Sequence, residues 1–456
     1  MINLSLPTLA AVLGVDPGSV PDIDFAGVTI DSRQSCAGKL FVAIQGPNFD
    51  GHKFVDAARR NGAVAALVQQ RQAGDIAQVE VADCKQALGQ VANYWRHHCK
   101  PCVIALTGSN GKTTVKEMLF QILAKQASSL ATRGNLNNDI GVPLTLFDLA
   151  PEHRYAIIEM GANHRGEIAR LAEIAEPDIV YVNNVAAAHL AGFGDVQGVI
   201  EAKGELYAYC GSEQQALFNA DEVASQYWRD ICGAHRQVSC GMDNSADVGA
   251  SWSLVDEVLR VEFSYCGETS ACTLGVLGEH NARNALAAVS LAILAGIEFE
   301  TAVASLAGFS GVRGRLQMLS GPAHSRLIDD SYNANPDSLE AGIKVLCSLQ
   351  GTPWLALGDM AELGDEAEDI HRQAGRLARE LGVEKLFGIG ELSCVASREF
   401  GASGYCFDRI EEMAEAILSQ IHQGVNLLVK GSRSAGMERL VTLLNQSFNG
   451  GDVNAV

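Results

Sequence analysis

Basic residues are scarce relative to acidic ones in this chain of 456 residues. There are 34 Lys and Arg against 54 Asp and Glu, which gives a formal net charge of −20. A protein that binds nucleic acid generally needs a basic surface that displaces counterions from the phosphates. The composition therefore argues against a nucleic-acid partner. It does not exclude a small anionic ligand, because a local basic cluster can bind one against the field of the whole protein.

Long apolar segments are also absent. No run reaches the roughly 18 apolar residues that a membrane-spanning helix needs, and the longest apolar stretch, Ala285–Ile297, predicts a packed helix. The N-terminus lacks the basic region of a signal peptide. Charged residues make up 19% of the chain, below the roughly 25% of an average globular protein, and hydrophobic residues make up 47%, which argues against disorder. We expect a cytoplasmic protein with no membrane span.

The twelve cysteines have no spacing typical of a disulfide framework, which favours reduced thiols in a cytosol. One pair, Cys99 and Cys102, has the spacing of a dithiol motif. A redox site needs this pair at the N-terminus of a helix that follows a strand. Here a helical stretch precedes the pair and a strand-like run follows it, so the order argues against redox chemistry.

The length suggests about three domains at roughly 150 residues each, and we place them at residues 1–82, 83–312 and 313–456. Each part alternates strand-like and helix-like stretches, which predicts an α/β fold with parallel sheets. Residues 254–277 instead alternate in polarity around Cys266-Gly267 and predict an antiparallel insertion. Strands are expected at residues 40–44, 63–68, 103–106, 155–158, 179–182, 326–328, 354–357, 385–389 and 427–429. Helices are expected at residues 54–60, 86–98, 168–175, 281–295, 338–349, 366–381 and 410–421.

Residues 107–114 read Thr-Gly-Ser-Asn-Gly-Lys-Thr-Thr and lie between a buried strand and an amphipathic helix, the context that a phosphate-binding P-loop requires. The glycines let successive N–H groups face a phosphate, and the helix N-terminus adds partial positive charge. Lys112 can reach the β- and γ-phosphate oxygens, and the Thr113 hydroxyl can ligate Mg²⁺. Gly108 and Gly111 are closer together than in the standard P-loop, and an ordinary glycine-rich turn is the alternative. The context nevertheless predicts a nucleotide-binding central domain.

Two further side chains follow strands of the expected central sheet. Glu159 comes directly after one strand, and His189 follows another. Ligands of open parallel sheets bind beyond the carboxyl ends of the strands, so Glu159 and His189 could hold Mg²⁺ together with Thr113. Taken alone, Glu159 could equally be a helix N-terminal charge and His189 a loop histidine. Lys203, inside an expected helix, reads locally as a solvated lysine.

Four motifs together resemble the Mur ligase family, whose members form amide bonds in peptidoglycan precursors at the expense of ATP. The resemblance covers nearly the whole chain and includes the shortened glycine spacing of the phosphate loop. It implies three domains: a small N-terminal α/β module, a central P-loop domain with a parallel sheet, and a C-terminal Rossmann-like domain. The motifs are residues 107–114, Glu-Met-Gly-Ala-Asn at 159–163, His-Asn-Ala-Arg-Asn at 280–284 and Asp-Asp-Ser-Tyr-Asn-Ala-Asn at 329–335.

Residues 134–143, 357–364 and 430–434 look like the family member that adds D-alanyl-D-alanine, and the Asp-Asn-Pro-Arg motif of the diaminopimelate-adding relatives is absent. The resemblance then implies UDP-N-acetylmuramoyl-tripeptide, D-alanyl-D-alanine and ATP as substrates, with Mg²⁺ as cofactor. The third residue of the tripeptide, diaminopimelate or lysine, stays open, and we expect a monomer. Alternatives are another amino-acid-adding Mur ligase or a folylpolyglutamate synthase. A P-loop motor or regulatory NTPase and a non-catalytic nucleotide-sugar-binding protein remain open as other classes.

The resemblance also assigns roles to single residues. It implies that Thr113, Glu159 and His189 ligate Mg²⁺ and that Lys203 becomes carbamylated, which turns a cation into an anionic ligand and needs a neutral, buried amine. With Lys112, the residues Glu159, His189 and Lys203 form the expected catalytic set. Nucleotide contacts are implied for Gly108, Ser109, Asn110, Gly111, Lys112, Thr113, Thr114, Asn284, Arg315 and Asp330. Contacts to the uridine nucleotide are implied for Ser32, Arg33, Gly46, Asp50 and His52.

Asparagines at the expected crevice are candidates for binding the incoming dipeptide. Asn333 and Asn335 follow a C-terminal strand, while Asn137 and Asn138 lie in a polar loop of the central domain. A zwitterionic dipeptide needs donors for its carboxylate and acceptors for its ammonium, and amides supply both without adding charge. The alternative is that these asparagines only build turns, as Asn often does.

Overall fold

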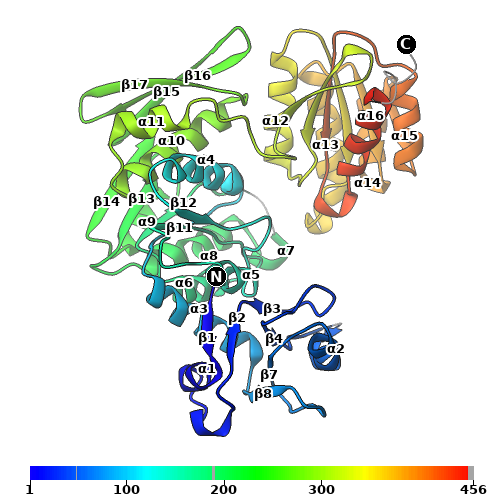
Figure 1. Cartoon of the computed structure of the whole chain (residues 1–456). Helices are drawn as coiled ribbons and strands as arrows, with labels where there is room; N and C mark the ends of the chain where they lie inside the picture. The colour runs from blue at the N-terminus through cyan, green and yellow to red at the C-terminus, as the bar shows by residue number, and fades with distance from the viewer. Residues whose placement is uncertain (48, 187–189, 450–456) are drawn as a thin grey trace, which may run out of the picture.

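The computed structural model describes residues 1–47, 49–186 and 190–449. Within these residues the chain forms three successive α/β bodies, which Figure 1 shows in blue, in cyan to green, and in yellow to red. The fold class predicted from the sequence is confirmed. The exact boundaries at residues 82 and 312 stay predictions.

The N-terminal body is built on a parallel sheet of order β3-β4-β7-β8, with β1 and β2 paired antiparallel beside it. Strands β4 and β7 are buried on both faces, as their continuous apolar runs predict. The predicted strand 63–68 begins later, at Ala65, because the Ala63 N–H caps the preceding helix by donating to Ala58 O at 3.0 Å. The elements are β1 (Asn3–Ser5), α1 (Leu6–Val12), β2 (Asp24–Ala26), β3 (Val28–Thr29), β4 (Leu40–Val42), β5 (Gln45–Gly46), β6 (Phe49–Asp50), α2 (Val55–Arg60), β7 (Ala65–Val68) and β8 (Ala77–Glu80).

The central body contains, within the described residues, a nine-stranded sheet of order β10-β11-β9-β12-β13-β14-β15-β16-β17. Its first part is parallel, while β15, β16 and β17 form the antiparallel meander that the alternation around Cys266-Gly267 predicts. The elements are α3 (Cys84–Cys99), β9 (Cys102–Thr107), α4 (Lys112–Ala124), β10 (Ser129–Ala131), α5 (Gly141–Phe147), β11 (Tyr155–Glu159), α6 (Glu167–Ala175), β12 (Ile179–Val182), α7 (Leu190–Phe193), α8 (Val196–Ala208), β13 (Gln215–Asn219), α9 (Ser225–Ile231), β14 (Arg236–Gly241), β15 (Val248–Val255), β16 (Val258–Tyr265), β17 (Glu268–Leu274), α10 (Glu279–Leu294) and α11 (Phe299–Leu306).

The C-terminal body is a second open sheet, of order β18-β19-β23-β20-β21-β22, in which only the edge strand β18 is antiparallel among the described strands. Apolar clusters cover both of its faces, as a parallel sheet requires. The elements are β18 (Gln317–Ser320), β19 (Arg326–Asp330), α12 (Pro336–Ser348), β20 (Thr352–Gly358), α13 (Ala367–Glu380), β21 (Lys385–Ile389), α14 (Glu391–Phe400), β22 (Gly404–Phe407), α15 (Ile410–Leu418), β23 (Val425–Lys430) and α16 (Glu438–Asn449).

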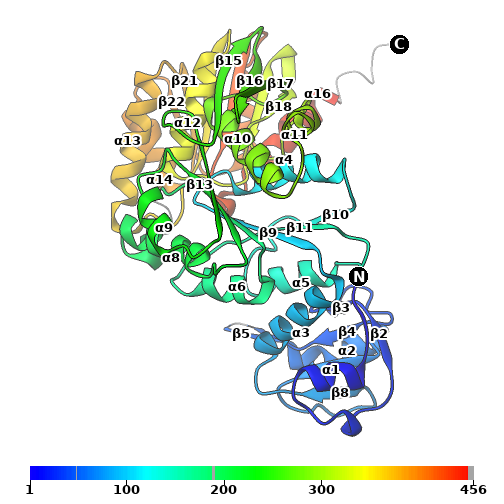
Figure 2. The same cartoon turned by 90° about the vertical axis from the view of Figure 1, so that its left-hand side faces the viewer.

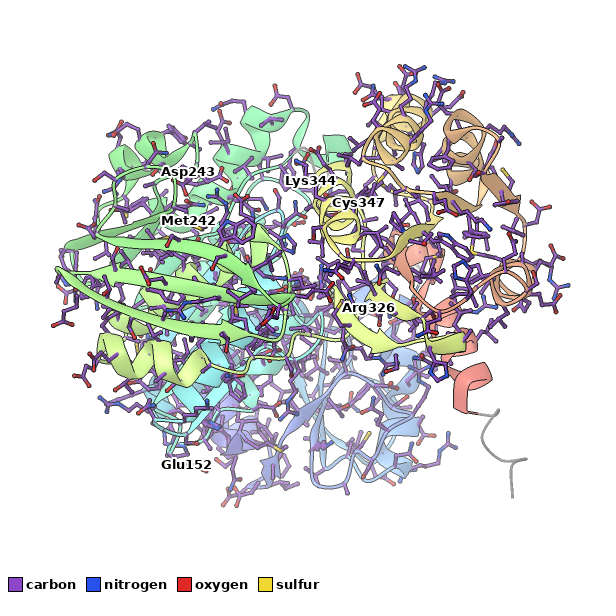
Figure 3. All side chains as sticks on the ribbon, turned by 90° about the horizontal axis from the view of Figure 1, so that it is seen from above. Glu152, Met242, Asp243, Arg326, Lys344 and Cys347 are labelled. Atoms are coloured by element: carbon purple, nitrogen blue, oxygen red, sulfur yellow. The ribbon has the colours of Figure 1, made fainter. Side chains whose placement is uncertain are left out.

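Two polar contacts join the C-terminal body to the central body. At one, Asn335 Nδ2 donates to Asn110 Oδ1 of the phosphate loop at 2.8 Å. At the other, Glu257 in the β15–β16 turn pairs with Arg326 at 2.8 Å and accepts from the Gln350 N–H at 3.1 Å. Figure 3 labels Arg326 on the C-terminal body where it faces this meander. Figure 1 shows the two bodies side by side, and Figure 2, in which they overlap, shows both of them above the N-terminal body.

The Cys99–Cys102 pair lies as the sequence predicts, after a helix and before a strand. Helix α3 ends at Cys99, Lys100 takes a left-handed conformation, and Cys102 begins β9. Burial raises the pKa of both thiols, that of Cys102 to about 12. Thiol chemistry needs the thiolate, so neither thiol is activated, and all twelve cysteines are free.

No helix in the described part of the chain combines the length and the apolar character that crossing a lipid bilayer requires.

Candidate active site

A cavity of about 1070 Å³ lies between the central and C-terminal bodies, at the carboxyl ends of the strands of both sheets. This is where ligands of open α/β sheets bind. The central body contributes the phosphate loop, the loop after β10, the segment after β11 and one residue of α8. The lining residues that carry the argument are Ser109, Asn110, Gly111, Lys112, Asn137, Asn138, Glu159, Lys203, Arg315, Tyr332, Asn333, Asn335 and Arg433.

The charge of the cavity is opposite to that of the chain. Seven basic residues line it, namely Lys85, Lys112, Arg165, Arg170, Lys203, Arg315 and Arg433, against four acidic ones, Asp139, Glu159, Glu167 and Glu362. The whole chain carries a formal net charge of −20. A local basic cluster of this kind attracts anionic ligands into the cavity even when the surrounding protein is acidic.

The phosphate loop joins β9 to α4 as predicted. Gly108 and Gly111 take positive φ angles of 151° and 77°, and a Cβ atom on Gly111 would lie 2.4 Å from Asn284 Oδ1. The N–H groups of Ser109 and Asn110 donate to O and Oδ1 of Asn184, at 3.0 and 2.8 Å. The Ser109 and Asn110 amides are therefore used within the protein, and the amides that open the helix, from Gly111 onward, can donate to a phosphate.

Lys112 begins α4 and lies inside the cavity. Its Nζ donates to Gly108 O at 2.6 Å and to Ser109 O at 3.3 Å. Burial, together with the positive charge of Arg315, lowers the pKa of Lys112 despite the nearby Glu159 carboxylate. The ammonium is thus held at the loop by two carbonyl oxygens, both of which a phosphate oxygen could replace.

Glu159 ends β11 and is 2% exposed. Its Oε2 accepts from the Thr113 hydroxyl at 3.0 Å, and its Oε1 accepts from Asn137 Nδ2 at 2.9 Å. The structure thus brings together Thr113 and Glu159, two of the predicted metal ligands. Asn137 orients the carboxylate from the loop after β10. His189 lies outside the described residues.

Lys203 is not the solvated helix lysine that its local sequence suggests. It lies in α8, is 2% exposed and lines the cavity. Burial and the neighbouring charge of Lys112 lower its pKa to about 7. At the next residue, Gly204, α8 packs closely on α9, because a Cβ there would lie 3.0 Å from the Trp228 ring.

Three predicted nucleotide contacts lie in different settings. The Arg315 guanidinium stacks over the Tyr332 ring at 4.0 Å and lines the cavity. Asp330 is buried, pairs with Lys430 at 2.5 Å and accepts from the Leu316 N–H at 3.2 Å. Asn284 is buried behind Gly111, where it accepts from Asn183 Nδ2 at 3.2 Å. Asp330 and Asn284 thus support the walls of the cavity in this structure, and their contact with nucleotide stays a prediction.

Of the asparagines predicted to bind the dipeptide, two have structural roles and one is free to face the cavity. Asn138 Oδ1 accepts from the Gly141 N–H at 2.8 Å, and Asn335 caps α12 in a reciprocal box with Ser338. Both build turns, the alternative that the sequence left open. Asn333 is exposed to the cavity, and the one bond its side chain makes among the described residues is to the adjacent Ala334 N–H.

The predicted uridine-nucleotide residues lie in the N-terminal body, away from the cavity lining. His52 Nδ1 lies 2.8 Å from Asp50 Oδ1, and His52 Nε2 accepts from the Gln69 N–H at 2.9 Å. Because Nε2 accepts, Nδ1 carries the hydrogen and donates to Asp50 Oδ1, and the pair fixes the loop after β6. Gly46 lies in β5, Ser32 O accepts from Asn61 Nδ2, and Arg33 is exposed beside Asp31. Their contact with a substrate stays a prediction.

Sequence reasoning missed several residues that shape the site. Asn183 and Asn184 donate to or accept from the phosphate loop, Lys116 lies buried beside Glu159, and the Arg433 guanidinium also lies over the Tyr332 ring, at 5.7 Å. A signal existed for the asparagines, because they follow β12 directly, as Glu159 completes β11. Nothing in the local pattern of α4 marks Lys116.

Comparison with known proteins extends this picture to the whole chain. Residues 24–96 match the family described as "Mur ligase family, catalytic domain", residues 106–292 "Mur ligase middle domain" and residues 314–433 "Mur ligase, glutamate ligase domain". The UDP-N-acetylmuramoyl-tripeptide–D-alanyl-D-alanine ligase of Escherichia coli (strain K12) is 39% identical over 98% of this chain and 99% of its own.

Two solved structures of similar proteins have the same fold as this chain. A crystal structure of MurF from Acinetobacter baumannii has a TM-score of 0.90 at 34% identity and covers 98% of this chain and 99% of that one. The MurF ligase from Thermotoga maritima, in complex with ADP, has a TM-score of 0.83 at 25% identity and covers 93% and 98%. The phosphate loop, the Thr113–Glu159 pair and the matches along the full length lead to one conclusion: this chain belongs to the Mur ligase family.

Proposed function

We propose that this protein joins D-alanyl-D-alanine to UDP-N-acetylmuramoyl-tripeptide at the expense of ATP, as a monomer in the cytoplasm. The observation that carries the proposal is the cavity in which Lys112, the Thr113–Glu159 pair and buried Lys203 face Arg315 and Asn333 of the other body. The similarity to a ligase of this name over 98% of the chain supports the choice of acceptor. A cytoplasmic location also suits the twelve free thiols.

The donor set near the phosphate loop fits Mg²⁺. This ion prefers oxygen ligands, and Thr113 Oγ1 and Glu159 Oε2 lie 3.0 Å apart. No group of three His, Cys, Asp or Glu gathers within the described residues, so a carbamate on Lys203 would supply the additional anionic oxygens. When bound, Mg²⁺ would offset the charge of the phosphates that approach each other in the reaction.

The reaction we propose begins when the tripeptide carboxylate attacks the γ-phosphorus of ATP. An acyl phosphate forms and ADP leaves. Two anions must approach each other in this step, and Lys112 and Arg315 supply positive charge on opposite sides of the cavity. The residues of the chain therefore act mainly by neutralising and positioning the reactants.

The amine of D-alanyl-D-alanine then attacks the acyl phosphate carbonyl. The amine nitrogen forms the new C–N bond and loses a proton, and inorganic phosphate leaves. Because an acyl phosphate is readily hydrolysed, the cavity must exclude water at this stage. The C-terminal body, which reaches the phosphate loop through Asn335 and Asn110, is placed to close it.

An acceptor panel tests the proposal. Phosphate release is measured with ATP, UDP-N-acetylmuramoyl-tripeptide and one of D-alanyl-D-alanine, diaminopimelate, lysine or glutamate. We expect turnover that depends on D-alanyl-D-alanine, with little ATP hydrolysis in its absence. Release with another acceptor would identify a different ligase, release without any acceptor would identify an NTPase, and no release would identify a binding protein.

Replacing Asn333 with alanine should raise the KM for D-alanyl-D-alanine and leave the KM for ATP little changed. The Asn333 side chain faces the cavity and makes its one described bond only to its neighbour, so its amide is available to the dipeptide. The comparison is Asn335→Ala, which removes a helix cap and should lower the stability by about 1 kcal/mol. If Asn333→Ala lowers the melting temperature or raises all three KM values equally, Asn333 is structural.

A further inference from the structure

Lys116 is a charged residue in the core of the central body. It lies on α4, four residues after Lys112, and its side chain is fully buried. Burying an ammonium costs free energy unless hydrogen bonds and opposite charges compensate. The carbonyl oxygen of Thr132 accepts from Lys116 Nζ at 2.5 Å, and Glu117 Oε1 lies 2.9 Å from it. The sequence of α4 gives no reason for a lysine at this position.

The third neighbour of this ammonium is the carboxylate at the centre of the site. Glu159 Oε2 lies 4.0 Å from Lys116 Nζ, and this same oxygen accepts from the Thr113 hydroxyl. The backbone of Glu159 is bonded to the same threonine that Lys116 contacts, because the Glu159 N–H donates to Thr132 Oγ1 at 3.0 Å. Lys116 therefore binds the residue that holds the backbone of Glu159 and also faces its carboxylate.

We propose that Lys116 is a positioning residue that holds the Glu159 carboxylate toward Thr113 and lowers the affinity of the site for a divalent cation. This inference rests on the ligase function proposed above. A fixed positive charge this close to a carboxylate opposes the binding of a second cation. The Glu159 carboxylate is thus well placed to ligate the ion, but the site binds the ion less tightly. Weaker binding suits an ion that arrives with ATP and leaves with ADP.

The inference predicts two effects of opposite direction. In Lys116→Met, Mn²⁺ used as a probe for Mg²⁺ should bind roughly threefold more tightly or better, because the opposing charge is gone. The kcat should fall roughly tenfold or more, because the Glu159 carboxylate is no longer held in place. Loss of a metal ligand, as in Glu159→Gln, should instead weaken Mn²⁺ binding.

The measurement is a Mn²⁺ titration followed by electron paramagnetic resonance, on the full chain with ADP, beside steady-state kinetics with Mg²⁺. Lys125→Met is the matched control, since Lys125 caps the C-terminus of the same helix and donates to the Ser305 carbonyl at 2.6 Å, away from Glu159. It should leave both quantities within twofold of the wild type. Lys116→Gln is the second variant, because its amide can still donate to Thr132 O if the methionine variant fails to fold.

Unchanged or weaker Mn²⁺ binding in the folded Lys116 variants overturns the inference. So does an equal change in Lys125→Met. Because Mn²⁺ binding is read without the ligation reaction, an inactive wild-type protein would refute the proposed function and leave this test intact.

Discussion

Replacing Lys112 with alanine should nearly abolish ligation while leaving the binding of UDP-N-acetylmuramoyl-tripeptide unchanged. Lys112 Nζ is held at the phosphate loop by the carbonyl oxygens of Gly108 and Ser109. Losing a positioned charge that acts on a transferring phosphoryl group costs roughly 10²-fold or more in rate, by analogy with the loss of an oxyanion-hole donor. Steady-state kinetics would give the rate, and calorimetric titration with the UDP-linked tripeptide would give the binding.

Lys125→Ala serves as the control for this experiment, because Lys125 lies near the other end of the same helix and bonds to Ser305. It should keep near-wild-type turnover. An alanine at position 112 that retains more than half of the wild-type turnover would show that the loop does not hold the reacting phosphate.

The second large effect is expected at Lys203, where alanine should reduce turnover roughly 10²-fold and a short carboxylic acid should restore part of it. The neutral amine is the form that attacks CO₂; a nitrogen–carbon bond forms and a proton is released. Because burial and the Lys112 charge lower the pKa of Lys203 to about 7, a substantial neutral fraction exists at neutral pH and falls as the pH drops below that value. Acetate or formate should replace the missing carboxylate oxygens in the alanine variant.

Carbon-13 NMR of the protein equilibrated with ¹³CO₂ supplies an independent measurement. A carbamate resonance should be present in the wild type, absent in Lys203→Ala and weaker below pH 6. Full activity of the alanine variant, or a wild type without the resonance, would show that Lys203 acts as an unmodified amine. Lys100 serves as the control, because Lys100→Ala removes a lysine outside the cavity lining and should keep the resonance.

Local patterns predicted most of the elements that carry the site. The buried run before residue 107 and the amphipathic helix after it place the phosphate loop, and the polar–apolar alternation of residues 254–277 places the antiparallel strands. The sequence analysis did not identify α14 and α16. In the structure α14 packs against α13, and α16 packs against α15. Element type thus followed from local periodicity where the period was long and regular.

Contacts between distant segments could not be predicted in the same way. Lys203 reads locally as a surface lysine, because its burial in the cavity depends on how α8 packs within the central body and not on the residues around it. The use of the Ser109 and Asn110 amides by Asn184 depends on the register between β9 and β12. The resemblance to the family implied a carbamylated Lys203 at the site, which stays a prediction, although Lys203 does line the cavity; it did not reveal that Asp330 is paired with Lys430.

The two polar contacts of the C-terminal body have a mechanical consequence. Beside these polar contacts, Leu277 of the central body packs into the apolar cluster of the C-terminal body. One polar contact is the Asn335–Asn110 bond beside the phosphate loop, and the other is Glu257 at the tip of the β15–β16 turn, held by Arg326 and Gln350. A ligand that takes Asn110 away from Asn335 would release the first contact only. The C-terminal body would stay joined to the central body through Glu257, through Leu277 and through the connecting chain, so it would rotate away from the phosphate loop and not separate from the central body.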